Sequence, residues 1–330
     1  MKKILLYVVI PLVVIVGGGY TALVLKKPAM NPPSAIKVEA TAERLQRGKY
    51  IFENVSDCGG CHSERNWEKF GAPVYDGRTG VGYAFPPELG LPGKVVAPNL
   101  TPDAETGLGS WSDGEKLRAI REGVSKDGRA LFPFMPYPHF RKMSDEDAYS
   151  VVAYMNSLPP VKNRMPRTEL NFPVNLMIKF APEPVTGQIR TPERTNRLKY
   201  GEYLVEMGGC AECHSQMEKG KVVEGKEFAG GTEFNFPGKL VRSANITPDE
   251  ETGLGKWSEQ RFVDKFKGFA NMTYDNAPRM NQSNFTLMPW LAMSQLPDED
   301  LRAIYTYLRT LKPVHNPVEV HPPLAPPPAQ

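Results

Sequence analysis

The hydrophobic pattern of residues 40–160 predicts three helices joined by long loops. Ahead of residue 57, apolar or small residues recur at intervals of three, four and three positions, at Leu45, Gly48, Phe52 and Val55. This spacing gives a first helix one buried face. Ser112 followed by Glu115 has the form of a capping box, which predicts the start of a middle helix. The apolar positions of that helix are Leu117, Ile120 and Val124.

A last helix is predicted after Ser144, where three acidic residues suit the positive end of the helix dipole. Its apolar positions are Val151, Tyr154, Met155 and Leu158. Between the helices lie long stretches rich in Gly, Pro and Asn, such as residues 71–110. Loops of this length rarely surround an ordinary core, so they predict packing around a bound group. The fold is therefore expected to be mainly α.

An internal repeat follows the same pattern. Residues 99–111, NLTPDAETGLGSW, recur as NITPDEETGLGKW at 245–257, and Gly48 is matched by Gly201. The late helix recurs as well, with Pro297 in place of Ser144, and proline is accepted near a helix start. The repeat predicts one domain present twice. We call residues 40–160 the first block and residues 197–314 the second block.

The N-terminus holds an uncharged run from Ile4 to Leu25 with two lysines on each side. As a helix it would be about 33 Å long, enough for a hydrocarbon core of about 30 Å. Secretory signals have a shorter apolar centre, so an uncleaved transmembrane anchor in the lipid bilayer is predicted. The expected order is an anchor with flanking lysines (1–27), a linker (28–39), the first block (40–160), a proline-rich connector (161–196), the second block (197–314) and a proline-rich tail (315–330).

The four cysteines form two identical patterns. Cys58 and Cys61 precede His62, and Cys210 and Cys213 precede His214. Structural zinc is the main alternative, but paired CxxC motifs in zinc sites usually lie much closer together than these, and a redox dithiol needs no adjacent histidine. In c-type haem both thiols add to the vinyl groups and the histidine ligates iron. Two such motifs predict two haem c groups.

The second axial ligand of each iron is expected to be a methionine. Met135-Pro136 and Met288-Pro289 occupy equivalent positions of the repeat, ten residues before each Asp-Glu-Asp run. Met280 and Met293 are the nearby competitors, and core filler is the alternative role of any methionine. His139 lies in the first block without a counterpart and is interpreted as a surface loop histidine, with an iron ligand as the alternative role. Methionine–histidine ligation raises the redox potential of haem iron and leaves no vacant position.

Charge argues against a nucleic-acid partner. The chain has a formal net charge of +3. The first block carries 14 basic and 16 acidic side chains, and residues 197–313 carry 15 and 16. Both blocks are therefore close to neutral, without the basic surface that nucleic acid requires.

With CGGCH or CAECH early, LFPFMPY or TLMPW late, and GKYIF or GEYLV before a tyrosine-bearing last helix, each block resembles a class I cytochrome c domain. The chain resembles membrane-anchored dihaem cytochromes, particularly the cytochrome subunits of membrane-bound alcohol and gluconate dehydrogenases. Those subunits usually carry three haems, whereas this chain has two motifs. The resemblance also implies that a glycine and an aromatic let the first and last helices cross closely, with Gly48 and Phe52 against Tyr154.

The resemblance implies electron transfer, from a membrane dehydrogenase or quinol-oxidising complex to an oxidase, reaction centre or soluble cytochrome. The alternative is a dihaem peroxidase in which one haem opens to bind peroxide. Because haem c is attached outside the cytoplasm in bacteria, residues after Lys27 are expected in the periplasm, held at the inner membrane. Possible haem propionate contacts are Asn99, Trp111, Asn245 and Trp257, for which a loop cap or core aromatic is the alternative role.

Overall fold

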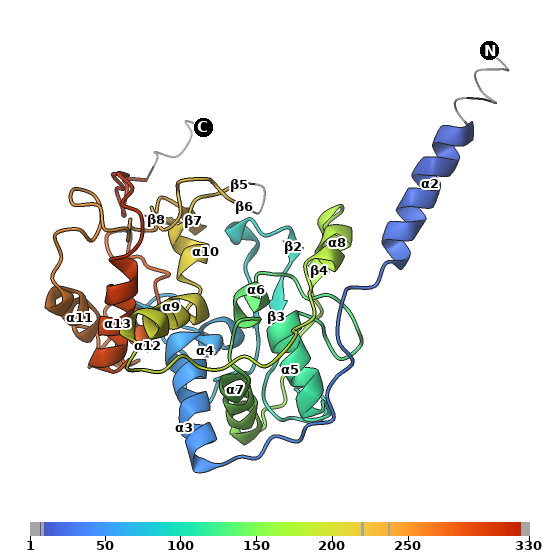
Figure 1. Cartoon of the computed structure of the whole chain (residues 1–330), viewed down its shortest axis with the longest axis horizontal. Coiled ribbons are helices and arrows are strands. Elements are labelled where there is room, and N and C mark those ends of the chain that lie inside the picture. Colours follow the sequence, from blue (N-terminus) through green and yellow to red (C-terminus); the bar gives the residue numbers. More distant parts are fainter. Residues whose placement is uncertain (1–6, 8–9, 219–220, 237, 325–330) are drawn as a thin grey trace.

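The computed structural model of the protein describes residues 7, 10–218, 221–236 and 238–324. Its globular part consists of two neighbouring groups of helices and loops, and one helix, α2 (Ile10–Leu25), extends away from them (Figure 1). The described strands are short and pair into two-stranded antiparallel sheets. The predicted mainly helical fold is therefore confirmed.

The first block contains the three expected helices, and its longest loops lie between them. Its elements are α3 (Ala42–Tyr50), the π-helix η2 (Ile51–Val55), α4 (Cys58–His62), β1 (Tyr83–Ala84), the 3-10 helix η3 (Pro87–Leu89), β2 (Gly93–Lys94), β3 (Val96–Ala97), α5 (Asp113–Glu122), α6 (Tyr137–Phe140) and α7 (Asp145–Ser157).

Two of its helix starts are set by side-chain caps that the sequence predicts. The Ser112 hydroxyl accepts a hydrogen bond from the Glu115 backbone N–H, and the Glu115 carboxylate accepts one from the Ser112 N–H. The capping box at the start of α5 is therefore confirmed. Ser144 caps α7 by accepting from Asp147 N at 3.1 Å.

The crossing of α3 and α7 has the close approach expected at Gly48. A Cβ atom added to Gly48 would lie 1.9 Å from the Ser150 carbonyl oxygen, so only glycine fits. One turn later Phe52 is fully buried, and its ring meets Tyr154 edge-on with centroids 5.4 Å apart. Phe52 belongs to a π-helical turn rather than to a continuous α-helix, a local widening that the three-four-three spacing did not predict.

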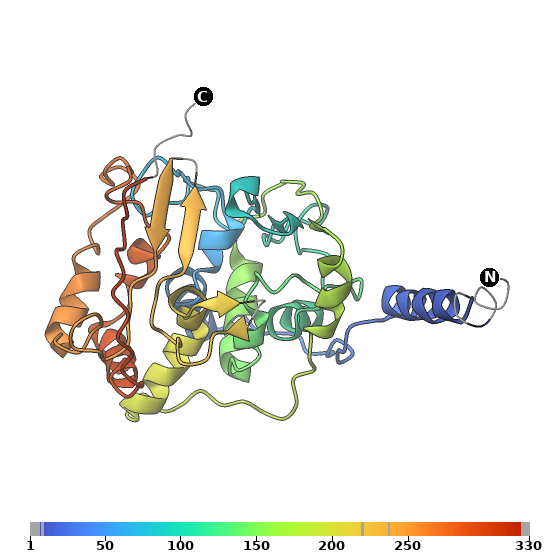
Figure 2. The same cartoon turned by 90° about the horizontal axis from the view of Figure 1, so that it is seen from above.

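The second block repeats the arrangement. A Cβ atom added to Gly201, in its first helix, would lie 1.9 Å from the Ala303 carbonyl oxygen in its last helix. Its hairpin of β7 and β8, which pairs Glu233 with Arg242, was not predicted (Figure 2). The elements are α9 (Arg197–Met207), α10 (Cys210–His214), β5 (Met217–Glu218), β6 (Lys221–Val222), β7 (Glu233–Phe236), β8 (Lys239–Arg242), α11 (Glu259–Lys267), α12 (Trp290–Met293) and α13 (Asp298–Leu308).

The two blocks contact each other through corresponding residues. The Tyr50 hydroxyl donates to Asp300 of the second block, and the Tyr203 hydroxyl donates to Asp147 of the first at 2.7 Å. Both carboxylates are buried, and each has an arginine partner as well, Arg47 for Asp147 and Arg194 for Asp300. A buried charge is stable only when it is paired, so these reciprocal contacts between tyrosine and aspartate favour one relative placement of the blocks.

The proline-rich connector folds back onto the first block. It forms β4 (Glu169–Leu170), which pairs with β2, followed by α8 (Val174–Met177) and the 3-10 helix η4 (Ile178–Phe180). The tail is tied to the second block by a side-chain hydrogen bond, which the Asn316 amide donates to Ala229 O at 2.9 Å. Residues 325–330 of the tail lie outside the described residues.

The expected membrane anchor coincides only in part with the described chain, since residues 1–6 and 8–9 lie outside it. The described helix α2 has 16 residues, and its large apolar side chains are exposed. Across the described residues, no helix combines the length and the apolar character needed to cross a membrane.

Candidate haem-binding sites

The first CxxCH motif forms a single short helix, α4, directly after the π-helical turn. Asp57 caps it in a left-handed conformation, and its carboxylate accepts a hydrogen bond from Gly60 N at 3.0 Å. Cysteines three positions apart on a helix lie on the same side, so the thiols of Cys58 and Cys61 share one face. Cys58 is half-buried and Cys61 is exposed. Two thiols so placed match the paired attachment that haem c requires.

His62, the last residue of α4, is held in one orientation. Its Nδ1 lies 2.9 Å from the Pro98 carbonyl oxygen, which can only accept, so Nδ1 carries the proton and Nε2 has a free lone pair. Burial lowers the pKa of His62 to about 4, and the imidazole is therefore neutral at physiological pH. A neutral histidine whose second nitrogen donates to a carbonyl is the usual form of an iron-ligating histidine.

The second motif repeats this geometry. α10 carries Cys210, Cys213 and His214, with Gly209 in place of the aspartate cap. The Nδ1 atom of His214 lies 2.7 Å from the Ala244 carbonyl oxygen, and burial lowers the pKa of this histidine too. The residues of both motifs therefore fit haem c: two thiols on one helical face and one oriented, neutral imidazole.

The thiols fit neither of the other sites that the sequence left open. Burial raises the pKa of the Cys210 thiol to about 12 and also raises that of Cys58, whereas a redox dithiol needs a lowered thiol pKa. Within the described ranges, no three His, Cys, Asp or Glu side chains gather in a way that could hold a metal ion. A tetrahedral zinc site made from the two motifs is therefore not formed there.

The two motifs nevertheless lie close to each other. The hydroxyl of Ser56, two positions before Cys58, donates a hydrogen bond to the carbonyl of Met207, three positions before Cys210, at 3.0 Å. The segments that lead into the two motifs are therefore in direct contact.

Met135 and Met288 occupy equivalent places in the structure. Each immediately precedes the proline that begins a short helix, α6 or α12, and each packs half-buried against the main hydrophobic core. The competing methionines, Met280 and Met293, are almost fully buried. Their side chains thus serve the core, while ligation by Met135 and Met288 stays a prediction.

Asn99 and Asn245 organise the two repeated loops. The Asn99 amide donates to Val161 O at 2.8 Å, and its oxygen accepts from the backbone N–H and hydroxyl of Thr101. Asn245 makes the same bonds to Val314 and Thr247. These contacts tie each NxTPD loop to the segment that follows the last helix.

The two tryptophans of the repeat pack half-buried against the main core. The Trp257 ring is also covered by the Arg261 guanidinium, 4.4 Å from the ring centroid. A propionate contact of either tryptophan, or of Asn99 and Asn245, stays a prediction.

His139 is not an ordinary loop histidine, which corrects the sequence-based interpretation. It lies on α6 at the boundary between the blocks, with Nδ1 2.8 Å from Glu206 and Nε2 2.6 Å from Glu212, the third residue of the second CxxCH motif. Arg65 was also missed: it donates to Gly60 O of α4 and to the carbonyls of Gly71 and Ala72, which fixes the loop beside the motif. An arginine three residues after the motif histidine was the only available signal.

We expect the stability of the protein to fall as His139 loses its proton. Hydrogen bonds that the imidazole donates to the carboxylates of Glu206 and then Glu212 raise the pKa of His139 to about 9, above its usual 6.5. A group whose pKa is higher in the folded state than in the unfolded state stabilises the folded protein fully at pH values below its unfolded-state pKa. This stabilisation is lost as the pH rises through its folded-state pKa. Between pH 6.5 and about 9 the free energy of unfolding should therefore drop by about 1 kcal/mol, a modest amount because Glu212 is partly in solvent.

Chemical denaturation across this pH range measures the effect. In His139→Gln the drop should be absent, because glutamine does not titrate. Lys142 also pairs with Glu206, and Lys142→Gln provides the matched control, whose pH dependence should equal that of the unaltered protein. Superimposable curves for His139→Gln and the unaltered protein would contradict the assignment.

The sequence comparison agrees with this chemistry. Residues 45–159 match the family model described as cytochrome c and are therefore a cytochrome c domain, which carries haem c.

Beyond that domain, most of the chain is similar to known cytochrome subunits. It is 28% identical over 293 residues to the cytochrome c subunit of the quinone alcohol dehydrogenase from Gluconobacter oxydans, covering 84% of this chain and 56% of that one. It is 29% identical to the gluconate 2-dehydrogenase cytochrome c subunit from Pantoea cypripedii, covering 83% and 60%. The chain thus spans little more than half the length of these relatives. A diheme cytochrome c-type protein from Cereibacter sphaeroides is 27% identical over 90% of this chain and 95% of its own length.

Proposed function

We propose that this chain is a membrane-anchored dihaem c-type cytochrome that carries single electrons as a subunit of a dehydrogenase or quinol-oxidising complex. The observation that carries the proposal is the repeated site: in each block two thiols share one helix face, and the neighbouring histidine is neutral, oriented through Nδ1 and free at Nε2. The relatives named as dehydrogenase cytochrome c subunits support the kind of partner.

The proposed ligand pairs are His62 with Met135 and His214 with Met288. Bound haem would supply a centre that is reversibly reduced by one electron. The protein's own contribution is to hold Nδ1–H of each histidine on a backbone carbonyl, which makes the ligating nitrogen more basic. Buried aromatic and aliphatic side chains around α3 and α7 keep water away from the first site.

Transfer between the two sites within one chain is part of the proposal. It is supported by the hydrogen bond between Ser56 and Met207, which joins the segments that lead into the two motifs, and by the paired contacts Tyr50–Asp300 and Tyr203–Asp147. Because these contacts bury charge at the boundary, they favour a fixed distance between the sites over a hinged one.

Anchoring at the bacterial inner membrane, with both blocks in the periplasm, completes the proposal. It is supported by the uncharged run of residues 4–25 and by the exposed apolar side chains of α2. The electron acceptor would be an oxidase, a reaction centre or another cytochrome.

Optical and electron paramagnetic resonance spectra of the purified full chain test the proposal. Two covalently bound haems per chain are expected, both low-spin in either oxidation state, because a methionine closes the sixth position of each iron. Reduction should be complete with a dehydrogenase of the related class and its substrate. A high-spin haem that binds peroxide rapidly would instead support the peroxidase alternative, and a protein without a Soret band would refute both.

A further inference from the structure

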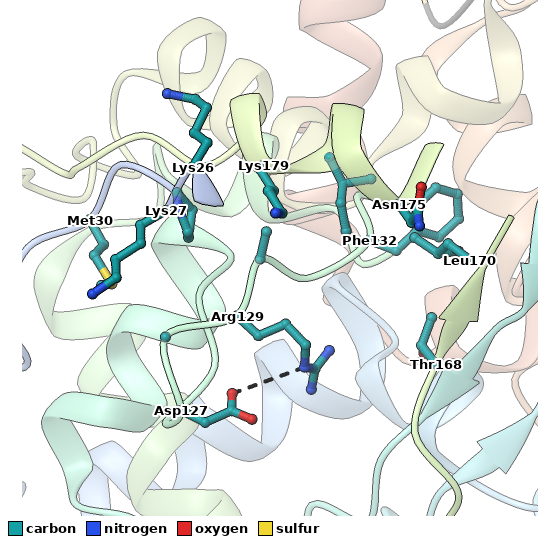
Figure 3. A pocket seen from close by; sticks show the side chains of 14 residues that line it. Lys26, Lys27, Met30, Asp127, Arg129, Phe132, Thr168, Leu170, Asn175 and Lys179 are labelled. Carbon is teal, nitrogen blue, oxygen red and sulfur yellow. Dashed lines mark ion pairs between the residues drawn. The ribbon is translucent and has the colours of Figure 1, made fainter. Parts of the chain in front are cut away.

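A pocket of about 530 Å³ lies where the chain leaves α2 and reaches the first block (Figure 3). Four separate segments form it: residues 26–30 just after α2, the loop 127–132, β4, and the turn formed by α8 and η4. None of these segments belongs to either CxxCH site. The pocket volume is within the range of small-molecule sites.

Positive charge dominates the pocket. Its lining contains Lys26, Lys27, Arg129 and Lys179 against a single carboxylate, Asp127. That carboxylate is shared between Arg129, at 4.0 Å, and Arg167 outside the pocket, at 3.4 Å. An anion would therefore meet a strong excess of cationic groups here.

Lys179 connects the pocket to the end of α2. Its ammonium group donates to the carbonyl oxygens of Leu23 (3.2 Å) and Val24 (2.6 Å) in the last turn of that helix. These carbonyls form the partially negative end of the helix dipole, so they hold Lys179 in place and offset only part of its charge. Lys26 lies over the Phe180 ring, 4.7 Å from the centroid, so α8–η4 and the end of α2 hold each other in place.

An apolar surface adjoins the charged one. Met30, Phe132, Leu170 and Ile178 line the pocket beside the cations. Phe172, Met177 and Phe180 of the connector are 70%, 63% and 57% exposed. Figures 1 and 2 both place α8 at the edge of the globular part that faces α2. Aromatic and apolar side chains next to lysines are typical of the boundary between lipid chains and headgroups.

We infer that this pocket binds the phosphate of an anionic phospholipid headgroup, while Phe172, Met177 and Phe180 enter the adjoining acyl layer. The inference rests on the proposed membrane anchoring. Free phosphate would use only the cations and would leave the apolar rim in water, whereas a phospholipid matches both halves. The connector thus becomes a second membrane contact that sets the height and tilt of the two blocks above the bilayer.

The test uses the purified full chain with vesicles of phosphatidylcholine alone or mixed with phosphatidylglycerol. Flotation measures binding to each vesicle, and native mass spectrometry counts the phosphatidylglycerol retained per chain. The double variant Lys27→Gln with Arg129→Gln removes two pocket charges but leaves Lys179 on α2. The matched control is Lys256→Gln with Lys312→Gln, two exposed lysines of the second block. Inorganic phosphate is added as a competitor in a separate arm.

We expect retention of phosphatidylglycerol by the unaltered chain and the control, and a loss of affinity of roughly 30-fold in the Lys27/Arg129 variant, since each basic side chain near a surface contributes about 1 kcal/mol. The haem spectrum should be unchanged. If the chain retained both lipids equally and still bound neutral vesicles, the proposed headgroup site would be refuted, while the proposed membrane anchoring would stand. Binding to anionic vesicles alone would refute the anchor and support the pocket. Binding to neither would refute both, and full displacement by inorganic phosphate would reduce the pocket to a simple anion site.

Discussion

Replacing Gly48 by alanine should destabilise the first block by about 1–3 kcal/mol, the usual cost of forcing an extra carbon into a packed interior. An added Cβ would lie 1.9 Å from the Ser150 carbonyl oxygen and 2.8 Å from the Tyr154 Cβ, so α3 and α7 would have to separate. In an open helix the same change would stabilise by about 1 kcal/mol. The sign of the measured change therefore shows whether the close crossing is real.

Guanidinium-induced unfolding, followed by circular dichroism, measures this effect. Gly201→Ala should behave similarly in the second block, where the added Cβ would lie 1.9 Å from Ala303 O. Gly268→Ala is the matched control, because the nearest atom to its added Cβ is 3.4 Å away and its φ of −55° suits alanine. A neutral or stabilising result at Gly48 would show that the helices cross farther apart.

If each block carries one haem c, as proposed above, converting both Cys58 and Cys61 to alanine should remove one of the two haems. Without these two thiols, no thioether bond to haem can form in the first block, while the thioether bonds of the second block would be unaffected. The pyridine haemochrome assay after acid–acetone extraction should therefore show half of the original haem. Hydrogen exchange in the loop of residues 71–110 should also increase, because those residues would lose the group around which they pack.

The reciprocal variant, Cys210→Ala with Cys213→Ala, is the matched control for this experiment. It should also retain half of the haem, but its faster hydrogen exchange should appear in the second block. Unchanged haem content in both variants, or zinc released in proportion to the chain by acid, would contradict attachment at the two motifs. Complete loss in either variant would indicate that the blocks do not mature independently.

Features that depend on neighbouring residues were predictable from the sequence. The capping box of Ser112 and Glu115 was confirmed, because a cap is made within one helical turn. The packing of Gly48 and Phe52 against Tyr154 joins distant positions, so the local pattern does not predict it; the family resemblance implied it, and the structure confirms it. The hairpin of β7 and β8 and the π-helical turn η2 were not predicted, since neither follows from a strong period in the local pattern.

By itself, the sequence determined the two CxxCH motifs, the repeat and the main helices, because thiol spacing, periodicity and capping act over a few residues. Only the tertiary structure decided how the parts meet. Tyr50 and Asp300 are 250 positions apart, and His139 and Glu206 are 67 apart, with no local pattern that links them. The basic pocket likewise unites four distant segments. Such contacts arise when the packed helices bring buried or charged groups within reach of each other, and that arrangement is a property of the whole fold.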